Sequence, residues 1–281
     1  MSNRTLLYVI SSETTDAEIS GAAETAAAEG THLACQVLGP APALPIHAYG
    51  VPPYGGVNIP DNWAETVEDA HAAHRARAEE IETLFAKANV SADIQPILCV
   101  PAEVRRQVAR RARVCDMALI AESLRETPDM FREAVNGVLF HSPIDLLLNT
   151  GPALKAGKVF IAWDSSEGAA KAVHAALPLL LSANEVTIGC FDPVVTEDMQ
   201  GADPGADLAA WLSHHGCRVT VSQFPSGGRE IADCILDRGA EMGADLVVMG
   251  AYGRSQLIET VFGGTTHSML KQRQMPVLLG H

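Results

Sequence analysis

No apolar stretch in this 281-residue sequence approaches the ~18 residues that a helix needs to span a membrane. The apolar segment near the N-terminus, Thr5–Ile10, is too short for the hydrophobic region of a signal peptide, and polar residues follow it. We therefore expect a soluble, cytoplasmic protein.

Paired cysteine motifs are also missing. The six cysteines include no Cys-x-x-Cys pair and lie mostly in or beside apolar segments with the pattern of strands. This distribution argues against a disulfide framework or a zinc site and favours reduced, buried thiols. The cysteines are Cys35, Cys99, Cys115, Cys190, Cys217 and Cys234.

Positive charge is scarce, because 20 lysines and arginines face 34 aspartates and glutamates, which makes the formal net charge −14. Such a chain repels nucleic acids and anionic membranes at long range, so we expect neither as a partner. One segment, 105–113, is rich in arginine. Val104, Val108 and Ala112 recur there at helical spacing, so we expect its arginines on the solvated face of a helix.

Familiar phosphate-binding and catalytic motifs are missing as well. The sequence contains no GxxxxGKS/T motif, no GxGxxG motif and no GxSxG nucleophile elbow. His71 and His74 have a spacing at which two imidazoles could share a metal ion, but no third ligand is suggested nearby. We interpret them as exposed helix histidines and predict neither a metal site nor a catalytic residue.

The sequence does contain a repeated alternation of strand and helix patterns, which is typical of parallel sheets covered by helices on both faces. We predict two tandem doubly wound, Rossmann-like α/β domains, each with a five-stranded parallel sheet flanked by helices. The expected strands are 6–10, 32–38, 91–100, 117–121 and 145–148 in the first half and 158–163, 185–191, 218–224, 245–250 and 276–279 in the second.

The two halves match at three places in the same order, which predicts an internal duplication. Segment 6–12 matches 159–165, segment 116–120 matches 245–249, and Glu133-x3-Gly137 matches Glu259-x3-Gly263. The linker-like segment 151–157 joins them, so we expect domains at residues 1–150 and 155–281. A proline-rich loop over residues 40–60 is long enough to form a lid or a plain surface connection.

One glycine-rich segment follows an apolar strand in the second half, with Gly250, Gly253 and Gly263 at its key positions. Glycines let backbone N–H groups approach a phosphate, and the helix expected after them would add free N–H donors. Arg254 could add charge and Thr265 a hydroxyl. The alternative is plain turn chemistry, in which the glycines only supply positive φ angles.

The pattern Gly-x2-Gly-x9-Gly, preceded by Ala-Asp-Leu-Val-Val-Met and followed by Met-Pro-Val-Leu-Leu, resembles the C-terminal signature of the universal stress protein family. The strand from Val159, which runs to Asp164, resembles the opening strand of that family. The resemblance implies an adenine nucleotide alpha hydrolase-like fold and, in many members, ATP as ligand. It covers nearly all of the second half and the first half more weakly.

The resemblance also implies roles for individual residues. The adenine side would be formed by the aspartate of the opening strand, the end of the second strand and the end of the fourth: Asp164, Phe191 and Met249. The ribose and phosphate side would be formed by Gly250, Gly253, Arg254, Gly263, Gly264 and Thr265. One position departs from the pattern, because Gly264 stands where ATP-binding members usually have serine or threonine.

The first half departs further from the pattern. Ala121 replaces Gly250, Ser11 replaces Asp164, and apolar residues 138–140 replace residues 264–266. An apolar segment cannot compensate the charge of phosphate oxygens, so we expect no ATP binding there in this mode.

From the resemblance we expect a regulatory protein that binds ATP or another adenine nucleotide in the second domain, with Mg²⁺ as an accompanying ion and without rapid turnover. The alternatives are an interaction or scaffold protein with two vestigial sites, and a slow ATPase. Family members often dimerise through the last strand. We therefore expect the exposed edges 145–148 and 276–279 to pair the two halves into an internal pseudo-dimer, and a further homodimer is compatible with the sequence.

Overall fold

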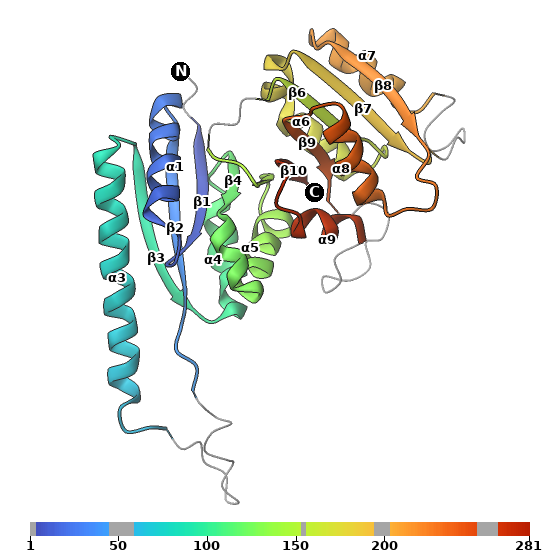
Figure 1. The fold of residues 1–281 in the computed structure, drawn as a ribbon. Coiled ribbons are helices and arrows are strands. Elements are labelled where there is room, and N and C mark those ends of the chain that lie inside the picture. The colour runs from blue at the N-terminus through green and yellow to red at the C-terminus, as the bar shows by residue number, and fades with distance from the viewer. Residues whose placement is uncertain (1–3, 45–58, 153–155, 194–202, 252–263) are drawn as a thin grey trace, which may run out of the picture.

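A computed structural model describes residues 4–44, 59–152, 156–193, 203–251 and 264–281. The two halves repeat one order of strands and helices (Figure 1). The first half consists of β1 (Thr5–Ser11), α1 (Asp16–Glu29), β2 (His32–Pro40), α3 (Trp63–Lys87), β3 (Ala92–Cys99), α4 (Pro101–Ala112), β4 (Met117–Ile120), the 3-10 helix η1 (Glu122–Glu126), α5 (Pro128–His141) and β5 (Leu146–Leu148).

The second half follows the same plan, with a slightly longer first helix and shorter later helices. It consists of β6 (Lys158–Ala162), α6 (Glu167–Ser182), β7 (Glu185–Phe191), α7 (Ala206–His214), β8 (Val219–Phe224), α8 (Ile231–Glu241), β9 (Leu246–Gly250), α9 (Gly264–Lys271) and β10 (Val277–Gly280). The predicted α/β architecture in tandem is confirmed, and the strand boundaries differ from the prediction by one or two residues.

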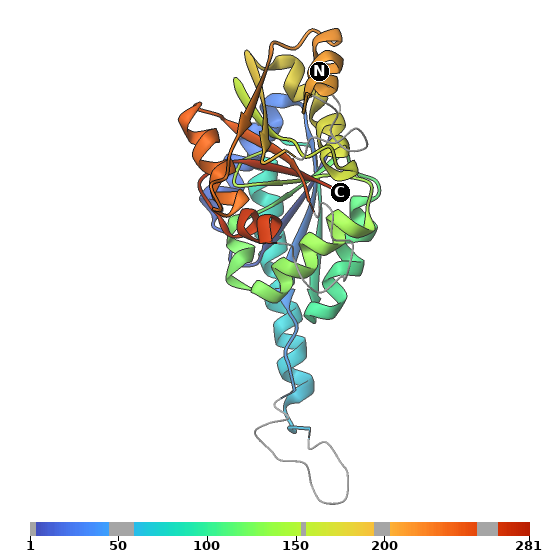
Figure 2. The same cartoon turned by 90° about the vertical axis from the view of Figure 1, so that its right-hand side faces the viewer.

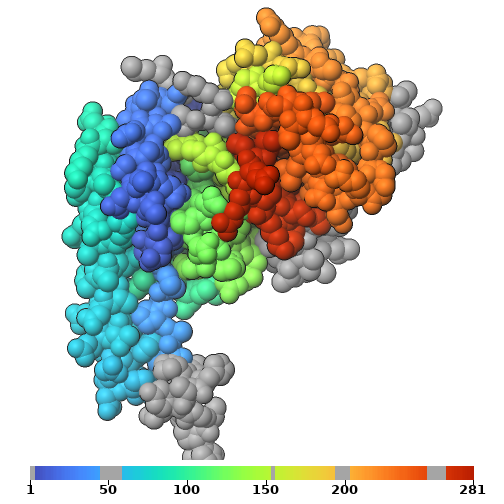
Figure 3. Space-filling view, in the orientation of Figure 1, coloured from blue at the N-terminus to red at the C-terminus, as the bar shows by residue number. Residues whose placement is uncertain are grey.

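All ten strands form one continuous sheet in the order β3-β2-β1-β4-β5-β10-β9-β6-β7-β8. Strands are parallel within each half, and β5 and β10 pair antiparallel, with Leu147 opposite Leu278. This is the expected pairing of the two last strands. Each half thereby covers an edge strand that would otherwise expose unpaired backbone groups. Figure 3 shows the C-terminal residues, in dark red, packed against the green segments of the first half.

The strands are apolar because both faces of the sheet are covered. One face packs against α4, α5, α8 and α9, through residues such as Val104 and Ile235. The other face packs against α1, α3, α6 and α7, through residues such as Ile19 and Val173. The six cysteines are free and buried, as expected. No described helix has the length and apolar character of a membrane-spanning segment.

The long helix α3 holds one correction to the sequence analysis. It extends well past the ends of the neighbouring strands (Figure 2). His74 lies on its buried side, is only 7% exposed, and its Nε2 lies 3.0 Å from the carbonyl oxygen of Val37. The expectation that this histidine is exposed was therefore wrong, because the helix turns it onto β2. Residues 45–58 of the proline-rich loop lie outside the described residues.

Candidate functional site

The strand order of the second half reverses between β6 and β9, which is the position where doubly wound sheets bind ligands. The register pairs Ala162 of β6 with both Gly189 of β7 and Met249 of β9. Two residues further along, Asp164 and Phe191 therefore come to the same level at the carboxyl edge of the sheet. The structure thus brings together the predicted adenine-side residues from three strands.

Phe191 and Met249 belong to one apolar cluster on the face that α8 and α9 cover. The ring of Phe191 lies 5.4 Å from that of Phe224 and 6.2 Å from that of Phe160, measured between centroids. Met249 is buried, whereas Phe191 is partly exposed at the end of its strand. This cluster therefore offers aromatic surface on which a planar, largely apolar group could stack.

Asp164 is exposed and is oriented by the turn into α6. Its Oδ1 accepts a hydrogen bond of 3.0 Å from the backbone N–H of Ser166. Ser166 in turn caps the helix, because its Oγ accepts a 3.1 Å hydrogen bond from the N–H of Ala169. The carboxylate is thereby held at the carboxyl edge of β6, within a turn that also contains Ser165 at φ 62°.

Gly250 has a packing role that the sequence did not indicate. A Cβ at this position would lie 2.4 Å from the backbone nitrogen of Ala169 in α6. Gly280 is similar, since its Cβ would lie 2.6 Å from the backbone nitrogen of Ala172. Both glycines let α6 lie directly on β9 and β10. At Gly250, helix packing alone is thus a sufficient reason for glycine.

Only part of the phosphate side falls within the described residues. Gly264 is the first residue of α9 and is exposed, and Thr265 follows it partly buried. Among the described residues, the nearest atom to a Cβ at Gly264 would be the carboxylate oxygen Oε2 of Glu230, at 3.6 Å. The predicted residues that lie outside the described part of the chain are Gly253, Arg254 and Gly263.

Glu230 was missed by the sequence analysis, because 34 residues separate it from Gly264 and no motif connects them. It immediately precedes α8, and its carboxylate lies beside the start of α9. The N-terminus of a helix favours anions, and a carboxylate there competes with a phosphate for the same position. Some features of the site therefore favour a nucleotide, whereas the carboxylate of Glu230 opposes binding of its phosphates.

In the first half, packed side chains occupy the region that is equivalent to the phosphate side of the second half. In the sequence, the 3-10 helix η1 and the helix α5 follow β4, as the glycine-rich segment follows β9 in the second half. Val138 and Leu139 are buried in the core, and a Cβ at Gly137 would lie 2.7 Å from the backbone oxygen of Arg105. Gly137 therefore serves the contact between α4 and α5, and apolar side chains occupy the positions that match residues 264 and 265.

Arg125 stands four residues after Ala121, just as Arg254 stands four residues after Gly250. Its guanidinium donates hydrogen bonds to the carbonyl oxygen of Gln272, at 2.9 Å, and to Oδ1 of Asn149, at 2.8 Å. The arginine of the first half thus binds the second half at the junction. The sequence alone did not indicate this contact.

The comparisons with known proteins concern the sequence of the second half and the fold of the chain. Residues 156–280 match the model of the universal stress protein family. The fold resembles a universal stress protein from Archaeoglobus fulgidus DSM 4304, with a TM-score of 0.62 and 16% identity, covering 98% of this chain and 95% of the other. It also resembles a candidate universal stress protein from Pseudomonas aeruginosa UCBPP-PA14, with a TM-score of 0.54 and 16% identity, covering 99% and 93%.

A comparison with curated protein sequences gave no match. The second half of this chain, residues 156–280, therefore matches the universal stress protein family in sequence, and the whole chain resembles proteins of that family in fold.

Proposed function

We propose that this protein is a regulatory protein of the universal stress type, which binds ATP or another adenine nucleotide in its second half without rapid turnover. The observation that carries the proposal is the position of Asp164, Phe191 and Gly250 at the carboxyl edge of the sheet, beside the reversal in strand order between β6 and β9. The glycine-rich segment starts at this same edge.

In this proposal the two sequence units, 1–150 and 155–281, have different roles. The second unit holds the nucleotide, with Mg²⁺ accompanying its phosphates. The first unit has lost this site and contributes the partner edge, so that β5 and β10 make an internal pseudo-dimer within one chain. The buried residues Val138 and Leu139 support this division, because they leave no polar lining for phosphates.

The direct test is calorimetric titration of the full chain with ATP and with AMP, with and without Mg²⁺. We expect binding of ATP, and no binding at millimolar nucleotide would refute the proposal. Gly264→Ser restores the hydroxyl of the ATP-binding pattern, and the nearest atom of the described residues to its Cβ lies at 3.6 Å. One added hydrogen bond should tighten ATP binding by roughly two- to tenfold. Gly264→Ala is the matched control without the hydroxyl.

The second candidate is an interaction protein in which both sites are vestigial. The carboxylate of Glu230 beside Gly264 favours it, because this charge repels phosphate. It predicts that neither the natural protein nor Gly264→Ser binds ATP. A slow ATPase remains a variant of the first candidate, and release of ADP above the buffer rate in the presence of Mg²⁺ would identify it.

A further inference from the structure

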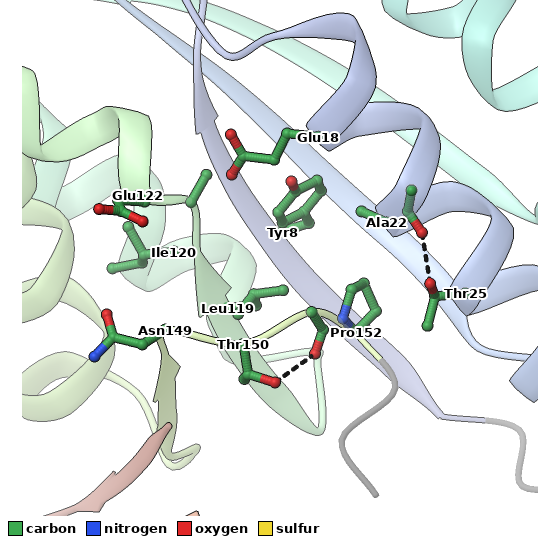
Figure 4. Close-up of a pocket in the computed structure, with 13 residues that line it drawn as sticks. Tyr8, Glu18, Ala22, Thr25, Leu119, Ile120, Glu122, Asn149, Thr150 and Pro152 are labelled. Atoms are coloured by element: carbon green, nitrogen blue, oxygen red, sulfur yellow. Dashed lines mark hydrogen bonds between the residues drawn. The ribbon is translucent and has the colours of Figure 1, made fainter. Parts of the chain in front are cut away.

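A cavity of about 520 Å³ opens in the first half between α1, β1, β4 and the segment that follows β5 (Figure 4). Its floor is largely apolar and includes Leu119 and Ala121. Tyr8 of β1 and Glu18 of α1 also line it, and Asn149 and Pro152 form another wall. The volume lies within the range of pockets that bind small molecules.

At the equivalent place in the described part of the second half, α6 packs directly on the strands, and the two halves differ there in pairs of residues. We align the helices α1 and α6 on their capping residues, Thr15 and Ser166. In this alignment Glu18 of α1 matches Ala169 of α6, and Gly21 matches Ala172. In the same comparison Ala22 and Thr25 correspond to Val173 and Ala176. All four α6 residues are buried, whereas their α1 counterparts line the cavity.

The strands that α1 and α6 cover also differ between the two halves. In the second half, Ala169 lies against Gly250 and Ala172 against Gly280, with backbone so close that no Cβ fits. In the first half the residues at the two glycine positions are Ala121 and Asn149. At the first of these positions the first half has a side chain on both surfaces, Glu18 on the helix and Ala121 on the strand, which prevents the backbones from approaching as closely. Accordingly α6 packs mainly on β9 and β10, whereas α1 packs mainly on α3 and β2.

The hydroxyl of Tyr8 is a polar group on the inner wall of the cavity. The residue is 2% exposed and lines the cavity, and its hydroxyl makes no hydrogen bond with any residue that the structure describes. Burial and the carboxylate of Glu18 raise the pKa of Tyr8, so the hydroxyl stays protonated. Because Tyr8 lines the cavity, a ligand inside it could accept or donate a hydrogen bond at this hydroxyl.

Among the described residues that line the cavity, the charged ones are Glu18 and Glu122, and both are exposed. Glu122 is paired with Arg273, at 3.0 Å, but Glu18 makes no ion pair within the described part of the chain. Partial burial and the neighbouring Glu122 raise the pKa of Glu18. The carboxyl of Glu18 is therefore short of a compensating cation.

We propose that this cavity binds a small aliphatic amine, whose ammonium group pairs with Glu18 and the Tyr8 hydroxyl while its methylene groups cover Leu119 and Ala121. The carboxylate of Glu18 and the net charge of −14 attract cations and repel nucleotide phosphates. The site is also separate from the proposed nucleotide site. It lies in the other half and on the sheet face of α1 and α6, whereas Phe191 and Met249 lie on the opposite face.

The test is calorimetric titration of the full chain with cadaverine, with pentanediol and glutarate as neutral and anionic molecules of the same length. We expect cadaverine to bind, more weakly at high salt, and the other two not to bind. Glu18→Gln should weaken cadaverine binding by about tenfold and Tyr8→Phe by about threefold. Glu24→Gln removes the same charge from an exposed position on α1 outside the lining, and it should leave the affinity within about twofold.

A second variant tests the cavity itself. Gly21 faces open space, since a Cβ there meets no atom within 4 Å. Gly21→Leu should fold, because leucine favours helices more than glycine does, and should abolish cadaverine binding by filling the space. Failure of the natural protein to bind cadaverine would overturn the proposal. So would pentanediol binding as tightly as cadaverine, or unchanged binding in a folded Gly21→Leu protein.

Discussion

Replacing Gly250 by alanine tests whether this residue serves packing before it serves any ligand. The added methyl group would lie 2.4 Å from the backbone nitrogen of Ala169 and 2.8 Å from the carbonyl carbon of Gly168. These obstacles are backbone atoms of a helix, so no side chain can turn aside to make room. The helix α6 must instead move away from β9.

The cost of that movement follows from what α6 buries. Ala169, Ala172, Val173 and Ala176 are all buried on this side of the helix. Overpacking of this kind typically costs 1–3 kcal/mol, and the rigid obstacle puts Gly250→Ala at the upper end, about 3 kcal/mol. For a chain of this size we expect the melting temperature to fall by roughly 6–10 °C.

Urea unfolding of the full chain, followed by circular dichroism, measures this loss. Gly239→Ala is the matched control, since its Cβ would meet only side-chain atoms at 3.5 Å or more, and alanine favours the helix by up to about 1 kcal/mol. If Gly250→Ala were as stable as the natural protein, the close approach of α6 would not be a constraint, and the packing explanation of this glycine would fail.

Three further predictions concern single side chains. Glu230→Gln removes the carboxylate beside Gly264 and should tighten ATP binding by two- to fivefold at low salt, as measured by calorimetry. Burial raises the pKa of Asp145 to about 7, so the folded protein holds this proton more tightly than the unfolded chain. Stability should fall as pH rises from about 4 to 7, by at most ~4 kcal/mol, and Asp145→Asn should remove that fall in urea unfolding measured across this range. Arg125→Ala leaves Oδ1 of Asn149 without its Arg125 donor and should cost about 2 kcal/mol in the same assay, whereas an unchanged midpoint would contradict its role at the junction.

The two halves illustrate how one fold reaches different packing from similar patterns. In both, a capped helix follows the first strand and lies over the same face of the sheet. Two glycines on β9 and β10 allow contact in the second half, and their replacement leaves a cavity in the first. The differences are single side chains at matched positions, so exchange of these residues between halves should move the helix.

The sequence by itself determined the order of strands and helices, the duplication and the place of the glycine-rich segment. These follow from local periodicity and from turn residues, which depend on neighbours along the chain. The pairing of β5 with β10 was also predictable, because the family resemblance and two exposed last strands indicated it. The tertiary structure decided what local patterns cannot encode: the burial of His74, the packing role of Gly250, the approach of Glu230 to Gly264 and the cavity under α1. Each of these depends on the volumes of side chains that meet only after segments far apart in the sequence have packed together.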